Sequence, residues 1–352
     1  MIGIGTYKLP RDEEKAVELI RYAINNGMNY IDGSRGYWDV ELRIAKALKD
    51  SYREKIFLSS KWSPWVMEME DCNEPNEYCV RKRIDESLKR LEVDYLDFYQ
   101  LWYINTVENF RIATKKGGMV DGVLKAIDEG IVGKIGYTTH ATSEDIITCL
   151  NESDWPSMIL VSYNVLNQEH EESLRVAHEK GITTMVMNPV GGGSFLRGNS
   201  FLKGLSDNVG TESIADLSIR FVLSNENVNG ILSGIANKSD VDNTIKSRKA
   251  CPLNSAKLNY IKKFVDSCKK INGFCVSCNY CMPCPQRINI PSIMQCVFLD
   301  DMGDIGEAKL NYSKMEEGIK AEACIGCGLC EEKCPQKLEI IKSMKRASEN
   351  YA

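Results

Sequence analysis

Two groups of cysteines near the end of the printed sequence have the spacing of ligands for a metal cluster. Of the 14 cysteines in the chain, eight lie in two tight groups that each end in Cys-Pro. The groups are Cys275, Cys278, Cys281 and Cys284, then Cys324, Cys327, Cys330 and Cys334. The second has the C-x₂-C-x₂-C-x₃-C-P spacing of bacterial ferredoxins, in which three cysteines hold one cluster and the remote fourth serves the other. The first is one residue shorter before its last cysteine.

This pattern predicts two [4Fe–4S] clusters with exchanged fourth ligands. We expect one cluster on Cys275, Cys278, Cys281 and Cys334, and the other on Cys324, Cys327, Cys330 and Cys284. Zinc is the main alternative, but zinc sites favour two pairs of ligands over four cysteines and a trailing proline. Because no export signal is evident, we expect the scattered cysteines to be plain residues and not disulfide partners. They are Cys72, Cys79, Cys149, Cys251, Cys268 and Cys296.

Asp32, Tyr37 and Lys61 have the side chains of a tunable general acid. A phenol is a poor proton donor at neutral pH, but a nearby ammonium lowers its pKa and a carboxylate keeps that ammonium charged and in place. Such a trio could protonate a carbonyl oxygen while a reductant attacks the carbon. The alternative is a surface tyrosine beside a structural Asp–Lys ion pair.

The elements that position these residues follow a regular alternation. Eight apolar strand-like runs, from MIGIGTYKL to VNGILSGI, are each followed by an amphipathic helical stretch. That count over about 250 residues is typical of a closed (β/α)8 TIM barrel. An open doubly wound sheet is the runner-up, but no Gly-rich dinucleotide fingerprint follows the first strand.

In such a barrel the chemistry lies at the carboxyl ends of the strands. The glycines of the GGG at 191–193 and the SGI at 233–235 expose backbone amides that suit a phosphate. His140 is placed either to touch a substrate or to hydrogen-bond another residue. Besides Asp32, Tyr37 and Lys61, the predicted mouth carries Trp102, Thr138, Thr139, His140, Asn164, Asn188, Gly191, Gly192 and Gly234.

The remainder of the chain has a helical pattern. INIPSIMQCVFLDDMG and EAKLNYSKMEEG lie between the cysteine groups and favour helices, as does LEIIKSMKRASEN after them. We therefore predict a barrel over 1–250, a linker helix within 251–273, and a small, mostly helical, ferredoxin-like iron–sulfur domain over 274–352.

Composition limits the partners and the cellular location that we expect. A net charge of −5 gives no reason to expect a nucleic acid or an anionic membrane as partner. No apolar run has membrane-spanning length, and the first residues lack the layout of a signal peptide. We expect a cytoplasmic protein with a small-molecule substrate.

Three stretches resemble a known family. YIDGSRGYWDVELRIAKALK is similar to the aldo-keto reductase signature, and FLSSKW and DYLDFYQL match two further segments of it. The resemblance covers residues 3–248, and the cysteine groups make the chain similar to the branch with a ferredoxin-like tail. It implies a catalytic tetrad in which Asp32, Tyr37 and Lys61 are three members. Trp102 stands where the fourth, normally a histidine, is expected, and indole can donate one hydrogen bond but cannot take up a proton.

The family's nicotinamide contacts are altered. The positions that contact the nicotinamide correspond to Thr138, Thr139, Leu160 and Met187, and altered positions near the adenine correspond to Asp240, Asn243 and Thr244. A carboxylate at 240 repels a 2′-phosphate, which Lys238 offsets in part. NADP(H) binding is therefore doubtful, and a flavin, or no diffusible cofactor, is an alternative.

Three functions follow from these features. The first is an oxidoreductase that reduces or oxidises a small carbonyl-type substrate with electrons passed through the clusters, supplied by a ferredoxin-like partner. The second is an NADPH-dependent aldo-keto reductase whose clusters are structural. The third is a non-catalytic electron carrier or redox sensor, which would not need Asp32, Tyr37 and Lys61 together.

Overall fold

The computed structural model describes residues 1–66, 69, 71–196, 200–267 and 275–351. It contains a closed barrel of eight parallel strands that pair in chain order, β1 with β2 through to β8 with β1. The strands are β1 (Ile2–Gly5), β2 (Tyr30–Asp32), β3 (Phe57–Trp62), β4 (Leu96–Leu101), β5 (Val132–Thr138), β6 (Met158–Ser162), β7 (Thr183–Met187) and β8 (Gly230–Gly234). The predicted barrel is therefore confirmed.

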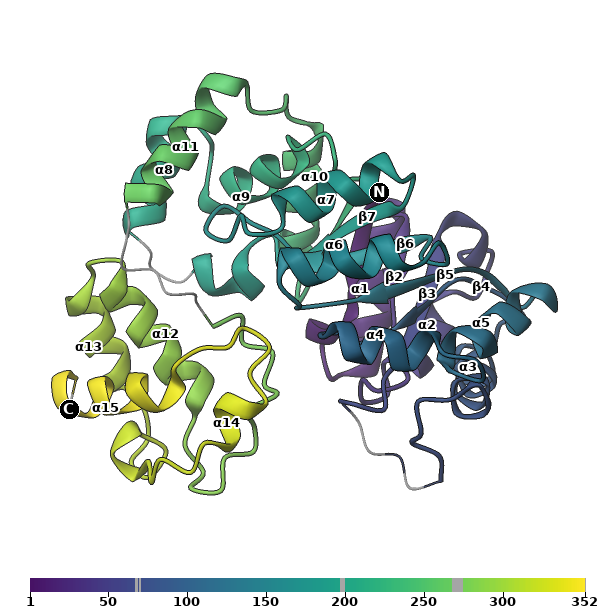
Figure 1. Ribbon diagram of the computed structural model, residues 1–352. Helices are drawn as coiled ribbons and strands as arrows, with labels where there is room; N and C mark the ends of the chain where they lie inside the picture. The colour runs from purple at the N-terminus through teal and green to yellow at the C-terminus, as the bar shows by residue number, and fades with distance from the viewer. Residues whose placement is uncertain (67–68, 70, 197–199, 268–274, 352) are drawn as a thin grey trace. The chain divides into compact units, whose positions relative to one another are not determined.

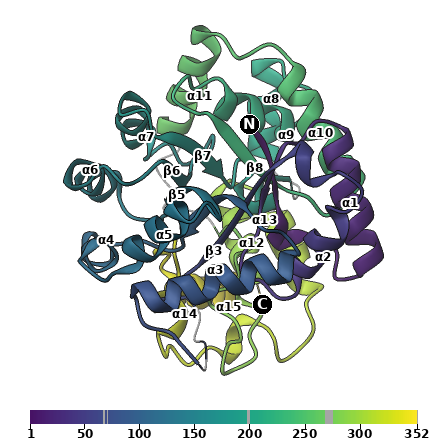
Figure 2. The ribbon, with the colours of Figure 1, turned by 90° about the vertical axis from the view of Figure 1, so that its right-hand side faces the viewer.

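Helices join successive strands and lie on the outside of the barrel, as α1, α2 and α3 do in Figure 2. They are α1 (Glu13–Asn25), α2 (Val40–Ala47), α3 (Glu77–Leu91), α4 (Val107–Thr114), α5 (Met119–Asp128), α6 (Ser143–Glu152), α7 (Glu171–Glu179) and α10 (Lys238–Lys249), with short turns η1 (Thr6–Lys8) and η2 (Arg53–Lys55). Polar residues cap several of them: Asp12 accepts from the Lys15 backbone N–H, and Asn76 from that of Cys79. Such caps satisfy backbone donors that a helix start leaves unpaired.

The barrel interior is filled by alternate strand residues. One buried cluster joins Tyr30, Phe98, Met158, Leu160, Met185 and Leu232. Successive residues of a strand point to opposite faces, so residues two positions further along share the inward side. That parity places Asp32, Gln100 and Trp102 on the inner side toward the carboxyl ends of β2 and β4.

Contacts divide the chain into two compact units. Unit 1 comprises Met1–Tyr163, Asn167–Pro189 and Val222–Pro252, and unit 2 comprises Asn164–Leu166, Val190–Phe221 and Leu253–Ala352. Unit 1 holds the strands (Figure 1). The segment 190–221, which follows β7 in the chain, thus groups with the C-terminal part.

Unit 2 is helical. Its elements are η3 (Gly191–Leu196), α8 (Ser200–Val209), most of α9 (Ile214–Leu223), α11 (Ser255–Ser267), α12 (Ile290–Asp301), α13 (Ile305–Ser313), η4 (Ala321–Ala323), α14 (Leu329–Glu332) and α15 (Ile340–Asn350). The helices α12, α13 and α15 form a core against which cysteines of both groups pack, with Ile293, Tyr312 and Met344 buried. The predicted helices after residue 274 are confirmed.

One prediction about the scattered cysteines is wrong: Cys72 and Cys79 form a disulfide. Asn76 turns the chain into α3, which brings the two Cα atoms to 5.5 Å, within disulfide range. Cys268 lies outside the described residues.

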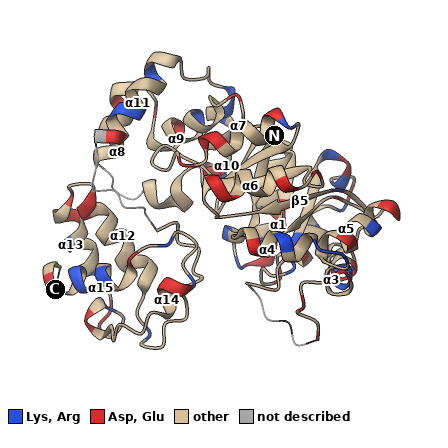
Figure 3. Cartoon of the chain, viewed as in Figure 1, with Lys and Arg blue, Asp and Glu red and all other residues tan. Residues whose placement is uncertain are grey.

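Figure 3 shows acidic and basic residues interspersed over the helices of both units. Among the described residues, no helix combines the length and the apolar character needed to cross a membrane.

Candidate functional site

Asp32 and Lys61 form a buried ion pair at the carboxyl ends of β2 and β3. Their side chains are only 6% and 2% exposed, and the Lys61 ammonium contacts Asp32 Oδ2. Lys61 Nζ also donates to the carbonyl of Gly33 at 2.9 Å. Burial lowers the pKa of Lys61 from its ordinary value, and the Asp32 carboxylate opposes that shift. The pair therefore fixes an ammonium where water does not screen it.

Tyr37 lies over this ammonium. Lys61 Nζ is 4.8 Å from the centroid of the Tyr37 ring. The ring also makes edge contacts with Trp102 at 5.4 Å and with Tyr7 at 5.3 Å, measured between centroids. The structure thus brings together the three predicted residues and Trp102, although they come from three different segments of the chain.

Gln100 is a member of this site that the sequence analysis missed. Its Nε2 donates to Asp32 Oδ1 at 2.8 Å and to Ser59 Oγ at 2.9 Å, and lies 3.3 Å from the Tyr30 hydroxyl. Its Oε1 is buried without a hydrogen-bond partner in the described part of the chain. The signal was available in DYLDFYQL, because Gln100 precedes Trp102 by two residues and so shares its side of β4.

Thr138 and Thr139, at the end of β5, are buried and have internal partners. Thr138 Oγ1 accepts from the Tyr103 backbone N–H at 3.1 Å, and its carbonyl accepts from Ile104 N–H at 2.9 Å. Thr139 Oγ1 accepts from Ala141 N–H at 2.9 Å. These bonds tie the loop after β4 to the segment after β5.

The remaining predicted cofactor contacts in unit 1 are spread over β7, β8 and α10. Asn188 follows β7 with a φ of 57°, and Gly234 ends β8 and is exposed. Lys238 begins α10 and forms an ion pair with Glu18, in which Lys238 Nζ lies 2.5 Å from Glu18 Oε1. Asp240, expected to repel a 2′-phosphate, instead accepts the backbone N–H groups of Ala236 and Asn237 in the cap of α10.

The other predicted cofactor contacts lie in unit 2. Asn164 is buried, and its Oδ1 accepts from Leu166 N–H at 3.1 Å. Gly191 and Gly192 have φ values of 58° and 64°, which favour glycine. A Cβ on Gly192 would lie 2.1 Å from the carbonyl oxygen of Val276. Gly192 thus has a packing role beside the first cysteine group, and a phosphate contact of either glycine stays a prediction.

Ser194 and Gln295 fasten the backbone of that cysteine group. Ser194 Oγ donates to the carbonyl of Cys275 at 2.6 Å. Gln295 Nε2, from α12, donates to Ser194 Oγ at 2.9 Å and to the same carbonyl at 3.0 Å. All three residues belong to unit 2.

The thiols lie in two neighbouring sets, and the exchange of fourth ligands between them stays a prediction. Burial raises the pKa of Cys278 and Cys281 to about 12, and nearby Cys275 and Cys334 add to both shifts, so these four lie close together. The second set lines a cavity of about 260 Å³. Its thiols are Cys284, Cys324, Cys327 and Cys330, and Cys281 of the first set reaches the same cavity.

Thiolate is the donor that holds [4Fe–4S] clusters in proteins. The second set would place four such donors around one hollow, with Cys284 coming from the first group in the sequence. Among the described residues, no three His, Cys, Asp or Glu side chains lie close enough together to hold a single metal ion.

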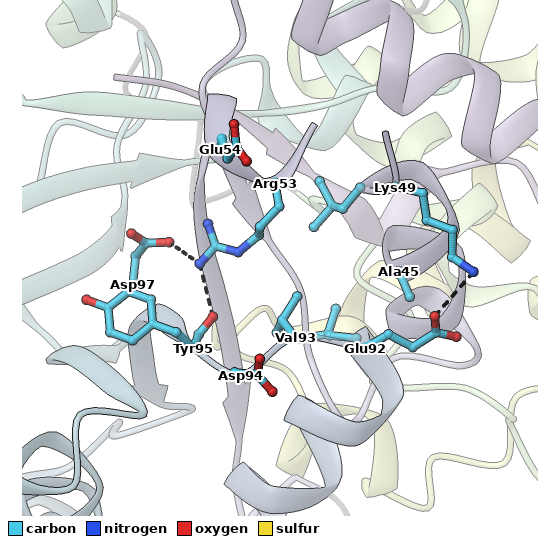
Figure 4. A pocket seen from close by; sticks show the side chains of 11 residues that line it. Ala45, Lys49, Arg53, Glu54, Glu92, Val93, Asp94, Tyr95 and Asp97 are labelled. Carbon is cyan, nitrogen blue, oxygen red and sulfur yellow. Dashed lines mark hydrogen bonds and ion pairs between the residues drawn. The ribbon is translucent and has the colours of Figure 1, made fainter. Parts of the chain in front are cut away.

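A different cavity, of about 510 Å³, lies at the amino ends of β3 and β4. Its lining includes two ion pairs, Arg53 with Asp97 at 2.7 Å and Lys49 with Glu92 at 3.3 Å (Figure 4). It is at the opposite end of the strands from Tyr37 and plays no part in the site.

Comparison with known proteins agrees with this architecture. The Aldo/keto reductase family model matches residues 1–266, and a 4Fe-4S dicluster domain model matches residues 274–339. The chain is 28% identical over 242 residues to a Glycine max protein named probable aldo-keto reductase 1, spanning 66% of this chain and 66% of that relative, just under two thirds of its length.

Two solved structures share the fold. An aldo-keto reductase from Bacillus halodurans, in its holo form, gives a TM-score of 0.65 at 23% identity, covering 75% of this chain and 91% of that one. An aldo-keto reductase from Klebsiella pneumoniae in complex with NADPH gives 0.62 at 19% identity, covering 75% and 89%. The chain therefore belongs to the Aldo/keto reductase family and carries a C-terminal 4Fe-4S dicluster domain.

Proposed function

We propose that this protein is an iron–sulfur oxidoreductase that reduces or oxidises a small carbonyl-type substrate at the barrel mouth, with electrons passed through two [4Fe–4S] clusters. The observation that carries the proposal is the buried Asp32–Lys61 pair under the Tyr37 ring, in a chain that also has eight cysteines in two groups, five of which line one cavity. When bound, such clusters accept and donate single electrons.

In the reducing direction, the substrate's C=O π bond breaks and a C–H and an O–H bond form, which consumes two electrons and two protons. Tyr37 gives one proton to the carbonyl oxygen, water supplies the other proton to the carbon, and water restores the phenol afterwards. Lys61 stabilises the phenolate in between, because its ammonium lies beside the ring. Asp32 keeps the Lys61 ammonium in place, and Gln100 keeps the Asp32 carboxylate in place.

Two sets of thiols favour electron transfer between clusters over a purely structural role, because one cluster would be enough to stabilise a small domain. Cys281 of one set lines the cavity of the other set, so the sets are neighbours. A ferredoxin-like partner is then the proposed source of electrons for the clusters.

The second candidate is an NADPH-dependent reductase with structural clusters. The Klebsiella pneumoniae neighbour holds NADPH, which favours a nicotinamide over a flavin as the diffusible cofactor. In this case a hydride would bring both electrons and one proton, and Tyr37 would still supply the other. Against it stand Thr138, Thr139 and Lys238, whose polar groups are already engaged within the chain.

A non-catalytic carrier is disfavoured by the ion pair. Removing two charges from water costs several kcal/mol per ion, which the pairing only partly repays. A scaffold for electron carriage would gain nothing from such a pair beside a tyrosine.

The test uses anaerobically reconstituted protein with methylglyoxal and propanal as probes. We expect Tyr37→Phe to lower kcat by about a hundredfold or more, whereas Tyr78→Phe, at a tyrosine that is 70% exposed, leaves it unchanged. Equal activity of the two variants would overturn the role of Tyr37.

Titration with NADPH distinguishes a nicotinamide from a protein donor as the source of electrons. If the clusters relay electrons from a protein donor, reduced ferredoxin bleaches the iron–sulfur absorption and supports turnover, and NADPH does neither. Turnover with NADPH and no bleaching would instead establish the second candidate.

A further inference from the structure

The loops that carry the two cysteine groups differ in how far they are covered. In the first loop (275–281), Val276 is 4% exposed, and its carbonyl is the group that a Cβ on Gly192 would meet. In the second loop (324–330), Ile325 stands at the equivalent position and is 67% exposed, and Cys327 and Leu329 are exposed as well. All these residues belong to unit 2. The second loop therefore leaves apolar side chains in solvent between its predicted cluster ligands.

The backbones of the two loops are alike, but the side chains on them are not. Ser277 and Asn279 in the first loop have φ values of 53° and 63°, and Gly326 and Gly328, at the equivalent positions of the second loop, have 68° and 84°. The first loop shows that this conformation accepts side chains. A Cβ on Gly326 would meet its nearest neighbouring atom at 4.0 Å, and one on Gly328 would have nothing within 4 Å. The glycines thus leave the backbone of the second loop open to the close approach of another molecule.

Two positive charges border the exposed residues of the second loop. Ile325 and Leu329 line the cavity of about 260 Å³, and Lys333 is the only charged side chain among the described residues that line it. Arg287 lies between the lining residues 286 and 288, and its backbone N–H donates to the carbonyl of Cys284 at 2.8 Å. Both cations are exposed, and within the described part of the chain neither forms an ion pair. We call Ile325, Leu329, Lys333 and Arg287 together the second-loop face.

We propose that the second-loop face is the docking site of an acidic electron-carrier protein of the ferredoxin type. The inference rests on the proposed function, because it names where the electron donor binds and by which charge it is recognised. Exposed apolar side chains with a polar border are typical of protein interfaces, and cations without partners favour an acidic surface. In each encounter the reduced carrier loses one electron and the cluster of the second set gains it, so two encounters supply the two electrons that the substrate takes up.

A second copy of this chain is a poorer occupant of the second-loop face. In a twofold dimer the same surface of both copies meets, so Arg287 and Lys333 of one copy would lie against the same two cations of the other. Like charges brought together across an interface oppose association. An acidic carrier meets no such repulsion.

The first experiment measures binding. Anaerobically reconstituted protein is titrated by calorimetry with an acidic two-cluster bacterial ferredoxin in its oxidised state. Ile325→Ser should raise the Kd about tenfold or more, as expected for an apolar side chain buried near the centre of an interface. Ile305→Ser, at an isoleucine of α13 that is 46% exposed, is the matched control and should leave the Kd unchanged.

A double charge reversal tests the recognition of an acidic partner. Arg287→Glu with Lys333→Glu should raise the Kd at least tenfold, and the variant should lose the weakening of binding by salt that the wild-type protein shows. Lys309→Glu with Lys314→Glu makes the same change in net charge at exposed lysines of unit 2 and should bind like the wild-type protein. Because no cysteine is substituted, both double variants should keep the full iron and sulfide content, and they decide the outcome even if Ile325→Ser loses iron.

Turnover with two donors separates this inference from the proposed function. Reduced methyl viologen, a small dye, needs no docking surface. The Arg287→Glu and Lys333→Glu double variant should keep at least the wild-type rate of methylglyoxal reduction with the dye, and should lose tenfold or more in kcat/KM for reduced ferredoxin.

Each outcome has one meaning. If reduced ferredoxin drives turnover and binds the two double variants equally well, the docking site is wrong while the proposed function stands. Equal losses with the dye and with ferredoxin would assign the second-loop face to the framework of the cluster and overturn the inference. So would a wild-type dimer, detected by sedimentation, that Ile325→Ser dissociates. If neither donor drives turnover of methylglyoxal or propanal, the inference and the proposed function are overturned together.

Discussion

Gln100 Nε2 donates a hydrogen bond to Asp32 Oδ1 at 2.8 Å, while Lys61 occupies Oδ2 of the same carboxylate. Asp32 is thus held from both sides, by an amide from β4 and an ammonium from β3. The orientation of the charged pair beside Tyr37 depends on a residue that carries no charge.

Replacing Gln100 by methionine, which has a similar shape, tests this dependence. We expect kcat to fall about tenfold because Asp32 loses one of its two anchors. The free energy of unfolding should fall by only about 1 kcal/mol, since the substitution also removes the unpartnered Oε1. Urea unfolding and the methylglyoxal assay measure the two effects; a stability loss without a change in kcat would assign Gln100 to packing alone.

The pKa of His140 predicts an acid-sensitive stability. Its folded value of about 4 lies below the ordinary value of 6.5, so between these two pH values the unfolded chain binds the extra proton. Stability therefore falls as the pH is lowered from 6.5 toward 4. The pKa of His170 is also lowered by burial, and its contribution has the same sign.

In His140→Gln the decline should be shallower. Urea unfolding midpoints at pH 7 and pH 5 measure it, with His178→Gln as the control that keeps the wild-type slope. An unchanged slope in His140→Gln would show that His140 titrates at its ordinary pKa.

Alanine substitutions at Gly192 and Gly204 test the packing of η3. The first glycine lies in η3 against another segment, and the second lies in α8 and serves as the control. A Cβ at Gly192 meets the Val276 carbonyl at a residue with a φ of 64°, whereas a Cβ at Gly204 in α8 has nothing within 4 Å. Gly192→Ala should cost about 1–3 kcal/mol and lower the iron content after reconstitution. Gly204→Ala should be neutral or stabilising by about 0.5–1 kcal/mol, as expected in a helix interior. Equal stability of the two variants would contradict the close approach at Gly192.

The exchanged ligand pattern predicts which cysteines act together. Cys334→Ser and Cys284→Ser should each remove about half of the iron and sulfide, and they should remove different halves. Mössbauer or EPR spectra should show that Cys334→Ser matches Cys275→Ser, and that Cys284→Ser matches Cys324→Ser. Cys251→Ser, at an exposed position, should keep the full content. A match of Cys284→Ser with Cys275→Ser would show that each group holds its own cluster.

Much of the site could be predicted because its members follow strand ends. Asp32 and Lys61 end apolar runs, and a closed barrel brings adjacent strand ends together. Gln100 was missed because it lies within an apolar run and not at its end, so only its spacing of two residues from Trp102 could have identified it. The Cys72–Cys79 disulfide was missed because a spacing of seven residues does not by itself dictate the turn that joins them.

Contacts between segments that are distant in the chain could not be predicted from the sequence. GGG at 191–193 has the composition of a flexible or phosphate-binding loop, and its packing against Val276 depends on residues more than eighty positions later. Two helices, α4 and α8, are additional to the single helical stretch that the alternation predicts after each strand.

The link from Ser194 and Gln295 to Cys275 has a practical consequence for engineering. The iron–sulfur module is discontinuous: part of its framework is encoded between the seventh and eighth strands. A transplant that begins at residue 274 would leave behind Ser194, whose hydroxyl donates to the carbonyl of Cys275. A chimera intended to add this iron–sulfur module to another barrel must carry the 190–221 insertion with it.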